Sequence, residues 1–319
     1  MKIVNLDGYT ANPGDLDWGN IPDMGEYVCY DRTSREQIVE RAKGAQALLI
    51  NKTVIDNNIL DALSPELKYI GLQSTGYNVV DCNYARKLGI TVSNIPAYST
   101  NAVAQLVFAF ILHITNRISL HSAAVRDGEW CSCPDFCFWK EPLTELDGKA
   151  IGIIGFGSIG QRVAKIAEAF GMKVFAYNPR EKSGNGFDTL KFCDLDTLLK
   201  NSDIITCHCP LTPDTENLIN ADNIAKMKKG VIFINTSRGP VVNESALADA
   251  LNNDLIFAAG LDVLSAEPPK RDNPLLTAKN CYITPHIAWA AKETRARLID
   301  ILEDNLRAYI DGMPKNTVN

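Results

Sequence analysis

Short apolar runs alternate with segments of helical spacing along both halves of the chain. In the first hundred residues, strands are expected at 3–6, 47–50, 69–72 and 90–92. Helices are expected between them, at 34–43, 54–63 and 81–88. This alternation is typical of βαβ units, and it predicts a parallel sheet covered by helices.

A long apolar helix is predicted over residues 101–118, and a second alternating series begins at Lys149. Between them, residues 122–149 show no period and predict an irregular arm. Further strands are expected at 150–154, 174–177, 204–207, 231–235, 257–261 and 281–284. Further helices are expected at 159–170, 195–200, 244–252 and 291–310. The second series therefore repeats the α/β architecture of the first.

The composition narrows the class of protein. A length of 319 residues predicts two domains, and 46% hydrophobic with 22% charged residues is ordinary for a soluble globular protein. A net charge of -6 without a long basic run argues against a nucleic-acid partner. No run of 18 apolar residues is present, so we expect no membrane span and no membrane partner. Nine cysteines without an export signal predict reduced thiols in the cytoplasm.

Residues 155–160 read Gly-Phe-Gly-Ser-Ile-Gly and fit the dinucleotide fingerprint G-x-G-x-x-G. They follow an apolar strand and open a helix, which is the context that the fingerprint requires. Gly155 permits the tight turn, Gly157 lets the backbone approach a pyrophosphate, and Gly160 lets the helix pack on the strand. The free amides where the helix begins, at Ser158 and Ile159, then bind the anion. The alternative is a glycine-rich turn without a ligand, which this context disfavours.

The residue after the next strand indicates which dinucleotide is bound. NAD sites commonly carry an acidic residue there, but this chain has Asn178. Asn178 can hydrogen-bond a ribose hydroxyl, and it does not repel a phosphate. Arg180 and Lys182 either attract a 2'-phosphate or are ordinary surface charges. The sequence therefore predicts NAD and leaves open NADP, or the use of both.

Arg238, Glu267 and His286 each lie beyond the carboxyl end of a predicted strand, where ligands bind in open α/β sheets. Reduction of a 2-keto acid needs a hydride, which a nicotinamide supplies, and a proton, for which His is the usual donor near neutral pH. A carboxylate beside the imidazole favours its protonated form, and a guanidinium grips a substrate carboxylate in a bidentate fork. We therefore expect His286 to donate the proton, Glu267 to support its charge, and Arg238 to hold the substrate. His208, at another strand end, is expected to line the cofactor side without doing chemistry.

Five ordered blocks together resemble the D-isomer-specific 2-hydroxyacid dehydrogenase family over essentially the whole chain. The blocks are the fingerprint 155–160, His208-Cys209-Pro210-Leu211-Thr212 with Thr215, Asn235-Thr236-Ser237-Arg238-Gly239, Gly260-Leu261-Asp262-Val263 with Glu267-Pro268, and Thr284-Pro285-His286. The resemblance implies that the family's catalytic set maps onto Arg238, Glu267 and His286. It also implies cofactor contacts from Pro210, Thr215, Thr236, Ser237, Arg238, Asp262, His286 and Ala288, with Asp262 contacting the nicotinamide amide.

The resemblance implies two α/β domains with Rossmann-like or flavodoxin-like parallel sheets and a deep cleft between them. The dinucleotide-binding domain, residues 101–286, is inserted into a discontinuous substrate domain, residues 1–100 and 287–319. The final helix is expected to return to the N-terminal part. Loops at 51–53 and 74–77 are expected to face the substrate, which would be bound by Asn51, Thr75, Gly76, Arg238 and His286. The long helix and the arm resemble the family's dimer contact, so a homodimer is expected.

Four further segments look like the glycerate dehydrogenases, also called hydroxypyruvate reductases. They are Asn5-Leu6-Asp7-Gly8-Tyr9, Asn12-Pro13-Gly14-Asp15-Leu16, Phe136-Cys137-Phe138-Trp139 and His286-Ile287-Ala288-Trp289-Ala290. This similarity implies hydroxypyruvate or D-glycerate as the small 2-keto or 2-hydroxy acid substrate. The phosphoglycerate, lactate, formate and branched 2-hydroxy acid types are the alternatives. A regulator that senses the dinucleotide without turnover is another, and the joint presence of Arg238, Glu267 and His286 argues against it.

Cys131, Cys133 and Cys137 form a C-x-C-x3-C pattern in the arm. A thiolate metal site there is the alternative to a set of reduced thiols. No paired C-x2-C motifs at zinc spacing are present, so we expect reduced thiols and no metal.

Overall fold

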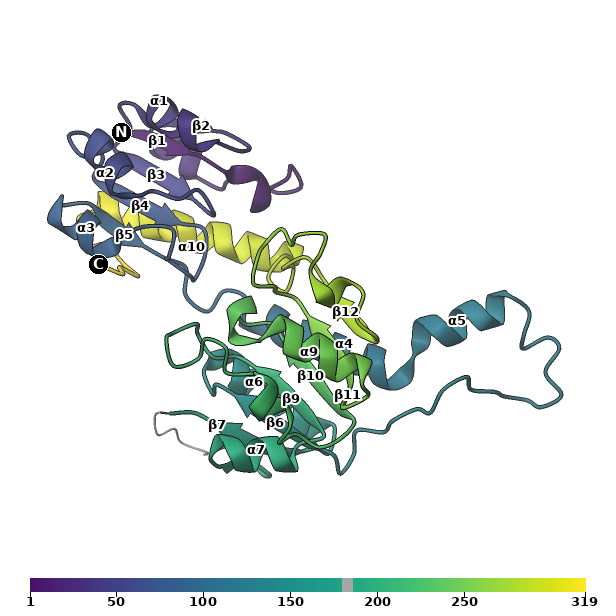
Figure 1. Ribbon diagram of the computed structural model, residues 1–319. Coiled ribbons are helices and arrows are strands. Elements are labelled where there is room, and N and C mark those ends of the chain that lie inside the picture. Colours follow the sequence, from purple (N-terminus) through teal and green to yellow (C-terminus); the bar gives the residue numbers. More distant parts are fainter. Residues whose placement is uncertain (180–185) are drawn as a thin grey trace. The chain divides into compact units, whose positions relative to one another are not determined.

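The computed structural model describes residues 1–179 and 186–319, which form two compact units (Figure 1). The outer unit comprises Met1–Ser99 and Trp289–Asn319, and the inserted unit comprises Thr100–Ala288. Each unit contains its own parallel sheet. The predicted architecture of two parallel-sheet α/β units is therefore confirmed. The assignment of one unit to the substrate and the other to the cofactor stays a prediction.

The sheet of the outer unit has five strands in the order β2-β1-β3-β4-β5. The strands are β1 (Lys2–Asn5), β2 (Glu26–Cys29), β3 (Ala47–Ile50), β4 (Tyr69–Leu72) and β5 (Thr91–Ser93). The helices are α1 (Ile38–Ala42), α2 (Asn57–Leu63), α3 (Cys82–Lys87) and α10 (Lys292–Ile310). This order is flavodoxin-like, and the direction of winding reverses between β1 and β3.

Helices cover both faces of this outer sheet. Along β3, Leu48 packs in a cluster with residues of α1, α2 and α3. Leu49 faces the other way and packs with Leu298 and Leu302 of α10. Since neighbouring residues of a strand point to opposite faces, the all-apolar run of β3 fits a sheet that is buried on both sides. The C-terminal helix thus returns to the N-terminal part, as predicted.

The sheet of the inserted unit has seven strands in the order β12-β11-β10-β9-β6-β7-β8. The strands are β6 (Ala150–Ile154), β7 (Lys173–Tyr177), β8 (Lys191–Phe192), β9 (Ile204–Cys207), β10 (Val231–Asn235), β11 (Ile256–Leu261) and β12 (Cys281–Ile283). The helices are α4 (Thr100–Asn116), α5 (Ile118–Arg126), α6 (Ser158–Ala169), α7 (Leu195–Asn201), α8 (Ala221–Ile224) and α9 (Glu244–Asn252). This is the doubly wound dinucleotide-binding order, with its switch point between β6 and β9.

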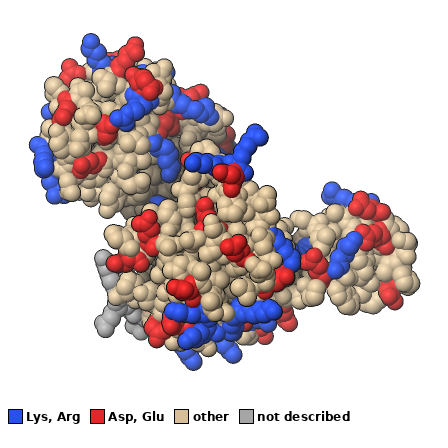
Figure 2. Space-filling view, in the orientation of Figure 1, with Lys and Arg blue, Asp and Glu red and all other residues tan. Residues whose placement is uncertain are grey.

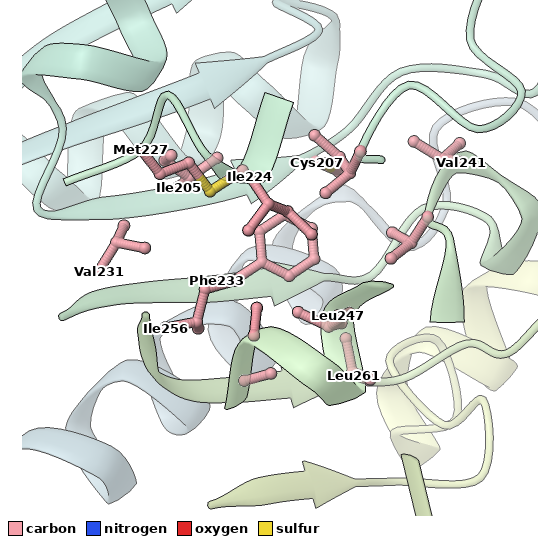
Figure 3. Close-up of a cluster of buried hydrophobic side chains, with 14 of the residues drawn as sticks. Ile205, Cys207, Ile224, Met227, Val231, Phe233, Val241, Leu247, Ile256 and Leu261 are labelled. Carbon is pink, nitrogen blue, oxygen red and sulfur yellow. The ribbon is translucent and has the colours of Figure 1, made fainter. Parts of the chain in front are cut away.

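Two apolar clusters hold the inserted sheet, one on each face. Ile232 packs with residues of α4 and α6, whereas the next residue, Phe233, packs with residues of α7, α8 and α9. Figure 3 shows Phe233 at the centre of the second cluster, beside Ile205 and Ile224. Burial of one large apolar side chain contributes roughly 1.5–3 kcal/mol to the stability of the fold. The two clusters therefore hold the strands in place, and with them the loops that follow the strand ends.

Two local predictions were wrong. The edge strand β2 was missed because its residues are only partly buried or exposed and so form no continuous apolar run. The helix predicted over 101–118 instead ends at Asn116, and α5 extends into the stretch predicted as irregular. Arg117 separates the two helices with a φ of 50°. Its side chain is buried, is paired with Glu141 at 2.9 Å and lies over the Phe257 ring, so tertiary contacts hold the break.

In the part of the chain that the structure describes, no single helix is long and apolar enough to cross a membrane. Only α4 and α5 taken together reach that length and composition, and they are bent by 51°.

Candidate active site

The glycine fingerprint lies between the end of β6 and the start of α6, at the switch point of the inserted sheet. Gly155 has a φ of 95°, and a Cβ there would lie 2.6 Å from the backbone nitrogen of Cys209. A Cβ on Gly160 would lie 2.3 Å from the carbonyl oxygen of Gly155. A Cβ on Gly157, in contrast, would meet no atom within 4 Å. Packing therefore requires the first and third glycines, whereas Gly157 borders open space.

Asn178 supports this loop from the end of β7. Its Oδ1 accepts a hydrogen bond from the Phe156 amide at 3.1 Å, and the Gly155 amide donates to the carbonyl of Tyr177 at 2.9 Å. Asn178 therefore stands at the predicted ribose position and also shapes the fingerprint. Arg180 and Lys182, on which the NADP alternative depended, lie outside the described residues.

The turn after β10 carries the next predicted contacts. The buried Asn235 holds it: its Oδ1 accepts from the Ser237 hydroxyl at 2.7 Å, and its Nδ2 donates to the Arg238 carbonyl at 3.0 Å. The hydroxyl of Thr236 is buried and has no partner among the described residues. A buried hydroxyl without a partner is costly, so Thr236 also fits a ligand contact at this edge.

The segment after β9 supplies Pro210 and Thr215, which the sequence placed beside the cofactor. The Thr215 hydroxyl donates to the Pro210 carbonyl at 2.6 Å and accepts from the Thr212 amide at 2.8 Å. Both residues therefore lie in one closed loop at the carboxyl edge of the sheet. The geometry assigns the Thr215 hydroxyl to holding this loop.

His208 directly follows the last residue of β9 and lies next to the fingerprint glycine Gly155. Its backbone packs against Gly155, and its Nε2 is 3.0 Å from the Thr206 hydroxyl. The Nδ1 atom is buried without a partner among the described residues. Burial lowers the pKa of His208 to about 3, so its imidazole is neutral at physiological pH. A neutral ring fits the predicted absence of acid chemistry there.

His286, which follows β12, is in contact with Glu267, which follows β11. Nδ1 of His286 lies 2.7 Å from Oε2 of Glu267, and Oε1 of Glu267 accepts from the Leu264 amide at 3.2 Å. Since Nδ1 faces the carboxylate, the other ring nitrogen, Nε2, is the one left to face a substrate. The side chains are 27% and 36% exposed, so a small molecule can reach the pair.

Asp262, at the end of β11, holds the loop that carries His286. Its buried carboxylate accepts hydrogen bonds from the Thr284 hydroxyl at 2.6 Å and from the amides of Ile287 and Ala288, both at 2.8 Å. Its own carbonyl accepts from the His286 amide at 2.9 Å, and His286 has a φ of 55°. Burial raises the pKa of Asp262, and these hydrogen bonds oppose that rise. Asp262 and Ala288, predicted as cofactor contacts, thus also fix the backbone around the imidazole.

Arg238 is exposed at the end of the β10 turn, and one of its guanidinium nitrogens donates to the Ser237 carbonyl at 2.7 Å. A Cβ on the next residue, Gly239, would lie 2.0 Å from the backbone of Leu264. Gly239 therefore allows the Arg238 turn to touch the loop whose Leu264 amide binds Glu267. The three predicted catalytic residues come from adjacent loops at one edge of the sheet.

In the outer unit, the backbone amides of one predicted substrate loop are hydrogen-bonded, whereas those of the other are free of partners among the described residues. The amides of Asn51, Lys52 and Thr53 donate to the carboxylate of Asp7, at 2.6 to 2.8 Å. The loop at 74–77 is held by the Ser74 and Thr75 hydroxyls, and its amides at 75–77 donate to no residue in the described ranges. Free amides therefore remain at Thr75 and Gly76, whereas any contact from Asn51 falls to its side chain.

Sequence reasoning did not predict the supporting roles of three residues. Asp7 binds the amides of the 51–53 loop in the outer unit, and Asn235 shapes the turn at Arg238 in the inserted unit. Asp262, predicted as a cofactor contact, also holds the backbone around His286. Each is a short polar residue at or just beyond the end of an apolar strand. That position was the available signal, but the partners are distant in sequence and became visible only in the structure.

Within residues 1–179 and 186–319, no three His, Cys, Asp or Glu side chains lie close enough together to hold a metal ion. Cys131 and Cys137 are exposed and Cys133 is partly buried, and all three are free thiols. The donor set therefore offers no arrangement for the thiolate metal site that the spacing left open.

Comparison with known proteins identifies the family. Residues 108–288 match the D-isomer specific 2-hydroxyacid dehydrogenase, NAD binding domain. A hydroxypyruvate reductase from Blautia hydrogenotrophica is 50% identical over 322 residues, which cover 100% of each protein. The chain belongs to the D-isomer specific 2-hydroxyacid dehydrogenase family. A glycerate dehydrogenase from Methylorubrum extorquens is 43% identical over 320 residues, covering 99% of this chain and 98% of that protein.

A structural relative agrees with this assignment. An acyclic imino acid reductase, solved in complex with NADPH and D-Arg, matches this chain with a TM-score of 0.85 and 32% identity, covering 100% of each chain. The family match and the two curated relatives show that this dehydrogenase is an oxidoreductase that acts on the CH–OH group of a 2-hydroxy acid with a nicotinamide dinucleotide. The predicted family, enzyme class and type of cofactor are confirmed.

Proposed function

We propose that this dehydrogenase reduces hydroxypyruvate to D-glycerate, and catalyses the reverse reaction, with NAD as its main cofactor. The observation that carries the proposal is the 2.7 Å contact between His286 and Glu267, next to the Arg238 turn. The hydroxypyruvate reductase at 50% identity supports the substrate, and the sequence segments typical of glycerate dehydrogenases support it independently.

The proposed chemistry divides among three side chains. The bound nicotinamide supplies or accepts the hydride. His286 donates a proton from Nε2 to the substrate oxygen, while Glu267 at Nδ1 stabilises the imidazolium form. Arg238 holds the substrate carboxylate and polarises the carbonyl with its guanidinium. The free amides of Thr75 and Gly76 are the further donors proposed for the carboxylate, and the side chain of Asn51 is the other proposed contact.

The fingerprint residues and the strand-end residues are the proposed cofactor contacts. The first turn of α6, including Ser158 and Ile159, offers its amides to the pyrophosphate across the open space at Gly157. Thr236 has a buried hydroxyl without a partner in the described part of the chain, which supports a contact there. NAD is proposed as the main cofactor because Asn178 can bind a ribose hydroxyl, and its neutral side chain still admits NADP.

A homodimer in the cytoplasm is the proposed working form. The arm exposes several large apolar side chains, and an exposed patch of this kind typically marks a protein contact. They include Trp130 (51% exposed), Phe136 (90%) and Trp139 (66%). Figure 1 shows the arm extending away from the rest of the inserted unit, so its apolar residues are available to a second copy.

The test is the variant His286→Ala, assayed with hydroxypyruvate and titrated with NADH. We expect kcat to fall by at least about 100-fold, in line with the loss of a general acid, while the Kd for NADH changes by less than about threefold. Equal losses of dinucleotide binding and turnover would contradict the role given to His286. His121→Ala, a change of the same size in α5, serves as the control and should leave kcat unchanged.

A further inference from the structure

A cavity of about 250 Å³ lies in the inserted unit, away from the proposed active site. Its wall includes Lys149, which precedes β6, and Asp203, which precedes β9. It also includes residues 228–230, which precede β10, and Phe257, near the start of β11. Because all these strands are parallel, their amino ends share one edge of the sheet. The fingerprint, Arg238 and Asp262 follow carboxyl ends and so belong to the opposite edge.

The cavity is lined by more positive than negative charge. Lys149, Lys228 and Lys229 face a single carboxylate, that of Asp203. Asp203 is already engaged, since it binds Lys228 at 2.9 Å and the Ala150 amide at 2.8 Å. Burial raises the pKa of Asp203, but the Ala150 amide, Lys228 and Lys149 outweigh that effect and keep it below its ordinary value.

Two of the three ammonium groups are not neutralised. Lys149 and Lys229 form no ion pair with any residue in the described ranges, and neither the Lys228 nor the Lys229 amide donates a hydrogen bond to one. The formal charge on the wall is therefore about two positive units with free N–H donors beside them. In Figure 2, basic and acidic side chains both lie on the lower part of this unit, so the excess positive charge belongs to the cavity wall itself.

We propose that this cavity, at the amino edge of the inserted sheet, binds a small phosphate dianion. The ligand is a phosphate group, either inorganic phosphate or that of a small phosphate monoester, held between Lys149 and Lys229. Two unpaired ammonium groups match its two charges, and a 250 Å³ cavity admits a molecule of that size but not a whole dinucleotide. Since the cavity lies at the edge opposite to the fingerprint, its ligand does not compete with the cofactor.

The experiment is calorimetric titration of phosphate into protein saturated with NAD+, at constant ionic strength. Saturation blocks the fingerprint, and the variants below distinguish the cavity from the anion site proposed at Arg238. We expect one phosphate per chain, with affinity that falls as sodium chloride is raised. The double variant Lys149→Ala and Lys229→Ala should bind it at least tenfold more weakly. The matched control, Lys87→Ala with Lys315→Ala, removes the same charge from exposed positions of the outer unit and should change the Kd by less than twofold.

A parallel titration with glycerol 2-phosphate distinguishes the two sources of the phosphate group, because the tighter ligand identifies which one the cavity takes. No binding to the NAD-saturated protein would overturn the proposal. Binding that the double variant leaves unchanged would overturn it as well. Light scattering on the native protein and the double variant is the last control. If the double variant loses phosphate binding together with a change in its oligomeric mass, the cavity is a contact between copies and the proposal is wrong.

Discussion

At the scale of single residues, short polar side chains at strand ends hold the loops that carry the proposed site residues. Asp262 accepts three hydrogen bonds from the loop that carries His286, and Asp7 accepts three from the loop at 51–53. A carboxylate suits this role because it offers only acceptors. The positions of Arg238, Glu267 and His286 beyond strand ends could be predicted from the strand pattern, and their catalytic roles stay a prediction. These supporting acids could not, because their roles depend on which loops the fold brings together.

Asp262→Asn tests this positioning role. The amide Nδ2 would replace one carboxylate oxygen and face N–H groups of Ile287 or Ala288, so a donor would meet a donor. We expect a loss of about 1–3 kcal/mol in unfolding free energy and a kcat at least tenfold lower. Asp304→Asn, on the exposed side of α10, is the control. Denaturant unfolding with a parallel assay measures both quantities, and an unchanged kcat would show that the loop does not depend on Asp262.

The carboxylate beside the imidazole makes a separate residue-scale prediction. Glu267→Gln keeps the size of the side chain but removes the negative charge 2.7 Å from Nδ1 of His286. The proton donor then lacks its charged partner, so kcat for keto-acid reduction should fall at least tenfold while the Kd for NADH stays the same. Rate measurements with hydroxypyruvate and an NADH titration give the two values. A kcat equal to that of the native enzyme would remove Glu267 from the mechanism.

At the scale of elements, buried strands were the most predictable part of the fold. The residues 47–50, 69–72, 150–154, 204–207 and 231–235 form strands with those bounds. All five strands are completely buried, so each reads as a largely apolar run, with Thr206 and Asn235 as the polar exceptions. The edge strand β2 and the break at Arg117 were not predictable, because partial exposure and distant partners leave no local pattern.

The start of α6 provides a matched pair of variants at this scale. Gly157→Ala places a methyl group in open space, so unfolding should change little while the Kd for NADH rises at least tenfold. Gly160→Ala places it 2.3 Å from the Gly155 carbonyl oxygen, so the fold should lose roughly 1–3 kcal/mol. Thermal unfolding and NADH titration of both variants separate the effects. Equal destabilisation by the two changes would show that Gly157 is a packing glycine.

At the scale of the whole molecule, the acid side of the stability curve depends on His208. Its pKa of about 3 in the folded chain lies below the ordinary value of 6.5. Between these pH values the unfolded chain binds a proton that the folded chain does not, so the unfolding free energy falls as the pH drops from 6.5 towards 3. His208→Gln removes this titrating group. The slope of unfolding free energy against pH should therefore decrease by up to the amount that one bound proton contributes. Denaturant unfolding between pH 7 and pH 4 measures the slope, and equal slopes in the two proteins would exclude His208 as the cause.

The proposed dimer is the other whole-molecule property. Phe136→Glu with Trp139→Glu places charge on the two most exposed aromatic residues of the arm, and burying those charges in a contact would be costly. We expect light scattering to show a dimer for the native protein and a shift towards monomer for the variant. An unchanged mass would remove this part of the arm from the interface.

The proposed reaction is tested by the loss of cofactor absorbance with hydroxypyruvate, run in parallel with NADH and NADPH. We expect rapid oxidation of NADH, oxidation of NADPH at an equal or lower rate, and D-glycerate as the product. Binding of either dinucleotide without oxidation, for hydroxypyruvate and for other 2-keto acids alike, would contradict the proposed reaction and favour a dinucleotide-sensing role instead.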